Sequence, residues 1–170
     1  MGSGKSAVGK ALASLMDLPF VDADEEIERQ ESTTIREIFE NRGEPVFRRI
    51  EFRVLREIVR NQGSFVFATG GGLPCSRGNS RFMRKKGTVV YLEVSPEEII
   101  SRIGNGSTRP VFTRITEGRS DLDGVRDLLR ERKRWYEKAH FTVKSGGSPL
   151  DTAKKIAGLV TGPGTHINGR

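Results

Sequence analysis

Hydrophobic positions along the chain switch between the spacing of helices and the spacing of strands. Over residues 6–16 apolar side chains recur every three or four positions, with Val8, Leu12 and Leu15 on one side. The same spacing predicts helices over residues 24–30, 34–41, 46–61, 122–139 and 150–160. Short apolar runs predict strands at residues 18–21, 64–69, 88–94 and 140–144.

The order of these elements indicates the fold class. Residues 88–94, TVVYLEV, are apolar nearly throughout, which is typical of a strand covered on both faces. Ser95, Pro96 and Glu97 follow as a helix start, with an N-cap serine, a proline at the first position and an early acid. Strands separated by helices predict a parallel sheet flanked by helices, the three-layer α/β class.

Length and composition favour one domain. A chain of 170 residues is long enough to bury a single core, and we assign it to residues 1–160. Residues 104–118 are glycine-rich, polar and basic without a period, so we expect a mobile loop there. Residues 161–170 lack a packing pattern, and we expect a disordered tail. No run of apolar residues is long enough to span a membrane, and no signal peptide is recognisable.

The net charge of +7 would by itself allow nucleic-acid binding. The arginines are spread along the chain, however, and few aromatic residues accompany the one dense run at 130–134. The arginines could equally serve small anionic ligands, because a guanidinium group matches phosphate and carboxylate. The single cysteine, Cys75, excludes an internal disulfide and fits a reducing cytoplasm, where we read it as an ordinary packing residue.

The first residues, MGSGKSAVGK, contain the second half of a phosphate-binding loop, G-x-x-x-x-G-K-[ST]. Its glycines allow backbone N–H groups to surround a phosphate, Lys5 would reach the outer phosphates, and Ser6 would bind Mg²⁺. A chance GSGKS in a flexible tail is the alternative. An amphipathic helix follows Lys5 at once, as a phosphate loop requires, so we favour the loop.

Three further motifs carry polar or glycine residues next to predicted elements. Asp22 and Asp24 end the strand at 18–21, where they could serve magnesium and hydroxyl chemistry or could simply cap a helix. Arg48 and Glu51 lie one turn apart in GEPVFRRIEFRVL, with a solvated helix face as the alternative. Three glycines, Gly70, Gly71 and Gly72, follow the strand at 64–69 and exceed what an ordinary turn needs.

Taken together, the chain resembles the shikimate kinases. The resemblance rests on six motifs in the family's order and spacing: GSGKS, the DAD at 22–24, GEPVFRRIE, TGGG, STRP and RERKRWY. It implies a P-loop kinase fold with a mobile lid at about residues 104–118. It also implies transfer of phosphate from ATP, with Mg²⁺, to the 3-hydroxyl of shikimate, on the route to chorismate and the aromatic amino acids. We expect a cytoplasmic monomer that binds no nucleic acid and no membrane.

The resemblance also implies roles for individual residues. The catalytic residues would be Lys5, Asp24 and Arg109, with Asp24 as the candidate base and Arg109 reaching the transferred group from the lid. ATP would be bound by Gly2, Ser3, Gly4, Lys5, Ser6, Ala7, Arg102 and Arg109. Shikimate would be bound by Asp24, Arg48, Glu51, Gly70, Gly71, Gly72 and Arg132. Because glycines occupy the place where many P-loop enzymes have an aspartate, the metal would be bound by Ser6 and Asp22.

One feature of the family is missing from the sequence. Its phosphate loop normally follows a hydrophobic strand in the middle of the sheet, and neither that strand nor the loop's first glycine precedes Gly2. Neighbouring strands would then lose ladder partners, at roughly 1–3 kcal/mol for each unpaired group. We therefore expect the true start to lie upstream of Met1, or else a short form that is inactive or unstable. Another small-molecule kinase of the same fold and a non-catalytic relative are the alternative functions.

Overall fold

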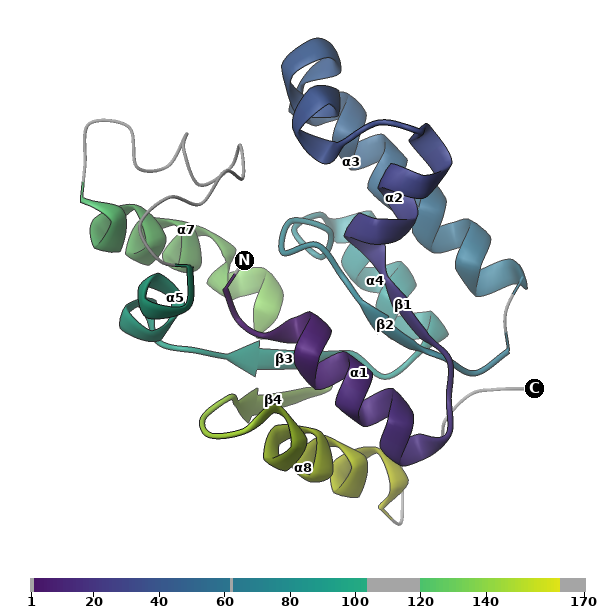
Figure 1. The fold of residues 1–170 in the computed structure, drawn as a ribbon, viewed down its shortest axis with the longest axis vertical. Coiled ribbons are helices and arrows are strands. Elements are labelled where there is room, and N and C mark those ends of the chain that lie inside the picture. The colour runs from purple at the N-terminus through teal and green to yellow at the C-terminus, as the bar shows by residue number, and fades with distance from the viewer. Residues whose placement is uncertain (1, 62, 104–119, 163–170) are drawn as a thin grey trace.

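A computed structural model describes residues 2–61, 63–103 and 120–162. The expected lid at 104–118, with Arg109, and nearly all of the expected tail lie outside the described residues. Helices and strands alternate along the chain (Figure 1). The elements are α1 Lys5–Met16, β1 Phe20–Asp22, α2 Ala23–Glu31, α3 Ile35–Asn61, β2 Val66–Ala68, α4 Arg77–Lys86, β3 Val90–Glu93, α5 Pro96–Ile103, α7 Asp121–Tyr136, β4 Phe141–Lys144 and α8 Pro149–Thr161.

Most predicted helices and strands are confirmed, with ends that shift by a few residues. The two helices predicted over 34–41 and 46–61 are joined as α3, with a kink at Gly43, whose φ of 76° is left-handed, and Pro45 soon after. The helix start at Ser95 is confirmed by a capping box in which the Glu98 N–H donates to Ser95 Oγ at 3.2 Å. Helix α8 includes Thr161, which the sequence pattern assigned to the tail.

Helix α4 has no counterpart among the predicted elements. Its sequence, RGNSRFMRKK, is too polar to show a helical hydrophobic period, and Ser80 is its only buried residue. Ser76 accepts a hydrogen bond from the Asn79 N–H at 3.2 Å and caps the helix. The three basic residues at 84–86 lie in the last turn, where they complement the helix dipole. Local capping and charge therefore identify this helix better than periodicity does.

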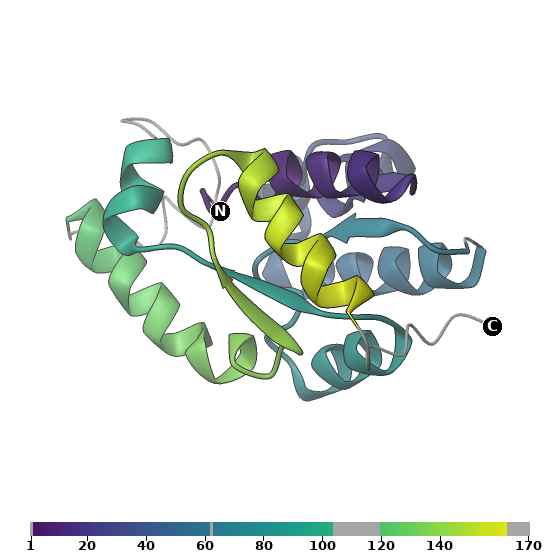
Figure 2. The same ribbon diagram turned by 90° about the horizontal axis from the view of Figure 1, so that it is seen from below.

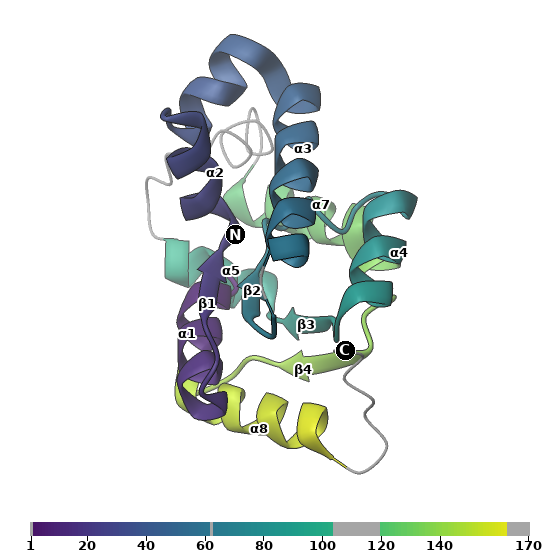
Figure 3. The same cartoon turned by 90° about the vertical axis from the view of Figure 1, so that its right-hand side faces the viewer.

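The described strands form two separate parallel pairs. Strand β1 pairs with β2, with Phe20 opposite Val66, and β3 pairs with β4, with Val90 opposite Phe141. Helix α1 lies on one side of the strands and α4 and α7 on the other, the layering of a three-layer α/β fold (Figure 2). In Figure 3 β2 and β3 are the inner strands, with β1 and β4 outside them. The expected break in the middle of the sheet is therefore confirmed within the described residues.

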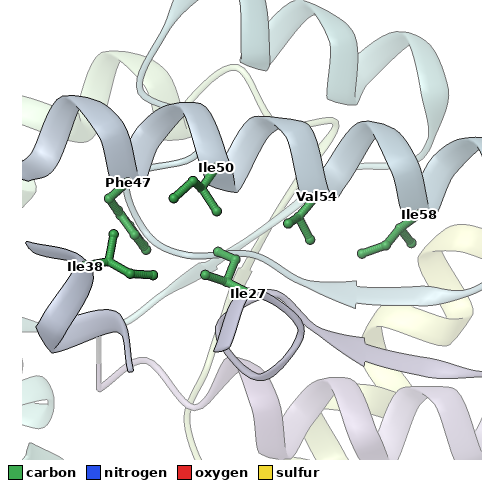
Figure 4. Packing of buried hydrophobic residues seen from close by; sticks show 6 residues of the cluster. All are labelled: Ile27, Ile38, Phe47, Ile50, Val54 and Ile58. Carbon is green, nitrogen blue, oxygen red and sulfur yellow. The ribbon is translucent and has the colours of Figure 1, made fainter. Parts of the chain in front are cut away.

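Each strand pair has its own hydrophobic core. Side chains from α2 and α3 pack together beside the first pair (Figure 4), namely Ile27, Ile38, Phe47, Ile50, Val54 and Ile58. A second cluster joins α1, β4 and α8 through Val8, Val143, Ala153, Ile156 and Val160. Burial of each Val, Ile or Phe side chain in these clusters contributes roughly 1.5–3 kcal/mol. The two halves are thus stabilised locally, and the ends of their strands carry the polar motifs.

Candidate active site

The phosphate loop has the backbone that its glycines allow. Gly2 and Gly4 have φ angles of 67° and 79°, in the left-handed region that favours glycine. Helix α1 begins directly after Gly4, which makes no side-chain cap, so its first N–H groups are placed to bind an anion. A cavity of about 130 Å³ lies here, lined by Gly2, Gly4, Lys5, Ser6, Ala7, Asp22, Asp24 and Thr69. Thr69 was not among the predicted site residues, although it directly precedes the three glycines.

Asp22 joins the phosphate loop to helix α2. Its Oδ2 accepts a hydrogen bond from Ser6 Oγ at 2.5 Å, and its Oδ1 accepts one from the Asp24 N–H at 2.9 Å. The second bond makes Asp22 the N-cap of α2. The helix-cap interpretation of Asp22 is confirmed, and the other oxygen of Asp22 points to the phosphate loop. The magnesium and hydroxyl chemistry expected of Asp22 and Asp24 stays a prediction.

Ser6 and Asp22 offer oxygen ligands that suit Mg²⁺. This ion is usually bound through one or two carboxylates together with phosphate oxygens and water. Among the described residues no group of three or more His, Cys, Asp or Glu could hold a metal ion on its own. The short contact between Ser6 and Asp22 at the mouth of the loop fits a metal shared with a nucleotide.

Arg48 is held by two carboxylates on α3. Its Nη1 donates to Glu51 Oε2 at 2.6 Å, and its Nη2 donates to Glu44 Oε1 at 2.9 Å. Glu51 is only 2% exposed, so the alternative of a solvated helix face is wrong. Burial acts against the charged form of Arg48, but the charges and hydrogen bonds of Glu51 and Glu44 outweigh it and raise the pKa of the guanidinium.

Glu51 is the most buried charged side chain of the site. Burial raises the pKa of its carboxyl group, while the nearby Arg48 opposes this change and Asp24 adds to it. Its Oε1 is buried and has no hydrogen-bond partner within the described part of the chain. An unsatisfied buried oxygen of this kind costs about 1–3 kcal/mol, so it is a candidate acceptor for a ligand hydroxyl.

The three glycines lie against this ion pair. A Cβ atom at Gly70 would be 2.1 Å from Glu51 Oε1, and one at Gly72 would be 2.4 Å from the Arg48 guanidinium. Only glycine therefore fits at these two positions without moving the charged groups. The carbonyl of Gly71 accepts a hydrogen bond from the Tyr136 hydroxyl at 2.8 Å, which ties the loop to α7.

Tyr136 is a site residue that sequence reasoning missed. It lies one turn after Arg132 on α7, and this i, i+4 spacing on RERKRWY was the available signal. Its ring stacks on Tyr91 of β3 with a centroid distance of 4.9 Å. Burial raises the pKa of its hydroxyl, and the charge and hydrogen bond of Arg132 oppose that change. Tyr136 and Arg132 therefore lie close together, next to the glycine loop.

Arg102 of α5 lies beside the phosphate loop. Its Nη2 donates to the Ser145 carbonyl at 3.2 Å, and a Cβ at Gly4 would be 3.5 Å from its Nη1. The ATP-binding role that the resemblance implies for Arg102 stays a prediction.

A larger cavity of about 1870 Å³ collects the predicted substrate residues. Its lining includes Asp24, Arg48, Glu51, Gly70, Gly71, Gly72 and Arg132, together with Lys5, Ser6 and Tyr136. Residues from α1, α2, α3, the glycine loop and α7 thus converge on one space at the carboxyl ends of the strands, where ligands of open α/β sheets bind. Two arginines, Arg48 and Arg132, two carboxylates, Asp24 and Glu51, and phosphate-loop residues in one cavity suit a small anion with hydroxyl groups.

Known proteins with related sequences and structures identify the family. Residues 1–160 match the family described as Shikimate kinase. A shikimate kinase of Paracidovorax citrulli is 44% identical over 161 residues, covering 94% of this chain and 83% of that protein. One of Aquifex aeolicus is 36% identical, covering 92% of this chain and 89% of that protein.

Solved structures agree with the sequence relatives. The structure of a shikimate kinase from Acinetobacter baumannii in complex with shikimate superposes with a TM-score of 0.86 at 39% identity, covering 94% of this chain and 88% of that one. The predicted resemblance is confirmed. The chain belongs to the shikimate kinase family.

Proposed function

We propose that this protein transfers the terminal phosphoryl group of ATP to the 3-hydroxyl group of shikimate, a step in aromatic amino acid biosynthesis. The single observation that carries this is the convergence of Arg48, Glu51 and Arg132 on the cavity that also contains Lys5 and Ser6. The related protein from Acinetobacter baumannii binds shikimate. Shikimate carries one carboxylate and several hydroxyl groups, and the cavity offers cations for the first and acceptors for the others.

The two arginines bind the carboxylate in this proposal. Arg48 is fixed by Glu51 and Glu44, so its guanidinium is oriented before the substrate arrives. Arg132, on α7, approaches from a different element and completes a bidentate site of the kind that arginine forms with carboxylates. Glu51 Oε1 is available for a ring hydroxyl, and the glycine loop lets the ring approach the backbone.

Asp24 positions and deprotonates the attacking hydroxyl. It lies in the first turn of α2 beside the phosphate loop and lines both the small and the large cavity. Phosphoryl transfer depends mostly on positioning and charge stabilisation, so a carboxylate within reach of the hydroxyl and Lys5 near the phosphates meet its needs. A magnesium ion held by Ser6 and Asp22 would neutralise charge on the phosphates when bound. Arg109, outside the described residues, would add positive charge at the transferred group.

The remaining expectations belong to the same proposal. The protein acts as a monomer on small molecules in the cytoplasm. None of the described helices is long and apolar enough to cross a membrane.

The test is a substrate panel. Purified protein with ATP and Mg²⁺ should release ADP with shikimate and not with gluconate or a nucleoside monophosphate, the substrates of other small-molecule kinases with this fold. A methyl ester of shikimate should be a poor substrate, because it lacks the charge that Arg48 and Arg132 bind. Equal rates with gluconate and shikimate would favour another kinase. No ADP release with any of them, despite ATP binding, would favour a non-catalytic relative.

A further inference from the structure

The two arginines of the cavity are held in different ways. Arg48 donates to two carboxylates, at 2.6 Å to Glu51 and at 2.9 Å to Glu44. Arg132 forms no ion pair with any residue that the structure describes. Other basic side chains of α7 do so, namely Arg126 with Glu97, Arg130 with Asp127 and Lys133 with Glu137. Arg132 must therefore be oriented by something other than a carboxylate.

The hydroxyl group of Tyr136 is a side-chain partner of Arg132. The two residues are four positions apart on α7, so their side chains lie on the same face of the helix. The Tyr136 hydroxyl donates its single proton to the Gly71 carbonyl at 2.8 Å, and its oxygen therefore accepts the hydrogen bond with Arg132. The guanidinium group has donors only, which agrees with this direction. The hydrogen bonds thus run from Arg132 to Tyr136 and from Tyr136 to Gly71.

Tyr136 is itself fixed at both ends of its side chain. Its ring stacks on Tyr91 of β3, with the ring centroids 4.9 Å apart. The carbonyl that accepts from its hydroxyl group belongs to the glycine loop, which is closed by a hydrogen bond of 3.0 Å from the Cys75 N–H to the Gly72 carbonyl. A tyrosine held in this way can keep a neighbouring guanidinium group in one orientation.

A phenol orients a guanidinium group without neutralising it. Burial raises the pKa of the Tyr136 hydroxyl, so this partner of Arg132 stays uncharged. Arg48 shares its charge with two carboxylates, whereas Arg132 keeps its own. Arg132, Tyr136 and Gly71 all line the large cavity. Arg132 is therefore the arginine that offers an incoming carboxylate the larger attraction, and Tyr136 is placed to aim it.

We propose that Tyr136 is a positioning residue for the carboxylate of the substrate. Its hydroxyl group, anchored on the Gly71 carbonyl, holds the guanidinium group of Arg132 in the orientation that binds this carboxylate. Tyr136 acts through Arg132 and not on the reacting atoms. The inference rests on the proposed function for the identity of the ligand, which is shikimate.

The first test needs neither substrate nor turnover. NMR measures the rate of rotation about the Cζ–Nε bond of each arginine in the free protein. Arg132 should rotate as slowly as Arg48, and more slowly than Arg130, whose side chain is 77% exposed. Tyr136→Phe keeps the ring but lacks the hydroxyl group, so it should release Arg132 and leave Arg48 unchanged. Rotation of Arg132 as fast as that of Arg130 in the original protein would overturn the proposal, and so would unchanged rotation in folded Tyr136→Phe.

The second test measures substrate binding. Tyr136→Phe should raise the KM for shikimate about tenfold and leave kcat and the KM for ATP unchanged, because a hydrogen bond to a charged group is lost. Tyr91→Phe is the matched control, since it removes the hydroxyl group from the other ring of the stacked pair and should change none of these constants. When Arg132 is already alanine, Tyr136→Phe should have no further effect on the KM.

The results separate the positioning role from the proposed function. An unchanged KM for shikimate in Tyr136→Phe would overturn the positioning role, and so would a further rise in the KM when Arg132 is already alanine. An original protein that neither binds nor phosphorylates shikimate would contradict the proposed function instead. The rotation of Arg132 in the free protein would then still decide whether Tyr136 orients it.

Discussion

Arg48 Nη1 and Glu51 Oε2 lie 2.6 Å apart across one turn of α3, and the second oxygen of Glu51 is buried without a hydrogen-bond partner in the described structure. The pair shows how the site is prepared for its ligand. The glutamate orients the arginine, and it retains an acceptor of its own. The glycines beside it make room for both groups. Both residues line the large cavity, so we propose that the pair forms part of the binding surface as well as supporting the helix.

Replacing Arg132 with alanine should weaken shikimate binding and leave ATP binding nearly unchanged. Loss of one partner of a buried charge pair costs about 2–5 kcal/mol, so the KM for shikimate should rise at least roughly 30-fold. Arg130→Ala is the matched control, because Arg130 lies on the same helix with its side chain 77% exposed and paired with Asp127. Steady-state kinetics with each substrate varied in turn measures both constants. An unchanged KM for shikimate in Arg132→Ala would remove Arg132 from the binding site.

Asp22→Asn should separate the two roles of Asp22. Asparagine is as good an N-cap as aspartate, so α2 and the Tm should be kept. The lost charge should weaken magnesium-dependent turnover, which a Mg²⁺ titration of the initial rate would show as a higher half-saturating concentration. Asp22→Ala should also lose about 0.5–2 kcal/mol of stability because the cap is gone. If Asp22→Asn keeps the Mg²⁺ dependence of the original protein, Asp22 serves the helix only.

Glu51 should make stability depend on pH. Burial raises its pKa in the folded protein, against the charge of Arg48, so folding favours its neutral form. The resulting stabilisation is fully present below the ordinary pKa of about 4.3 and is lost as the pH rises through the raised value. Glutamine at position 51 cannot ionise. The free energy of unfolding of Glu51→Gln, relative to that of the original protein, should therefore increase as the pH rises from 4 to 8.

Thermal unfolding across that range gives the difference in Tm at each pH. Glu57→Gln is the control, because Glu57 lies further along α3 with a side chain 43% exposed. If the Tm of Glu51→Gln and the Tm of the original protein differ by the same amount at every pH, Glu51 has the same pKa in the folded and the unfolded protein.

Gly70→Ala should disturb the site directly. The new methyl group would meet Glu51 Oε1 at 2.1 Å, and the carboxylate could not move without breaking its bond to Arg48. Overpacking of this kind costs typically 1–3 kcal/mol, so we expect a lower Tm and a higher KM for shikimate. Gly78→Ala is the control, since nothing lies within 4 Å of its added methyl group. A Gly70→Ala protein with the Tm and KM of the original would mean that the ion pair has room to shift.

Much of the site could be predicted because its motifs are local. GSGKS, DAD and the three glycines each follow or precede one element, and the fold brings the ends of those elements together. Tyr136 could not be predicted in this way, since its partner Gly71 is 65 residues away in sequence. Helix α4 was missed because its sequence, RGNSRFMRKK, has only two large apolar side chains, Phe82 and Met83, which are adjacent and set no helical period. The pairing of Arg48 with Glu44 could not be predicted either, because it depends on side-chain conformations that a sequence motif does not specify.

Direct identification of the product tests the proposed function most decisively. The protein is incubated with ATP, Mg²⁺ and shikimate, and a ³¹P–¹H correlation spectrum shows which hydroxyl group carries new phosphate. The account predicts a single phosphate ester on the 3-hydroxyl, formed only when both substrates are present and strongly reduced by Asp24→Asn, which keeps the shape of the side chain but cannot accept the proton. A product phosphorylated elsewhere, or the same yield from Asp24→Asn, would contradict the role of Asp24. No shikimate ester at all from folded, ATP-binding protein would contradict the proposed function itself.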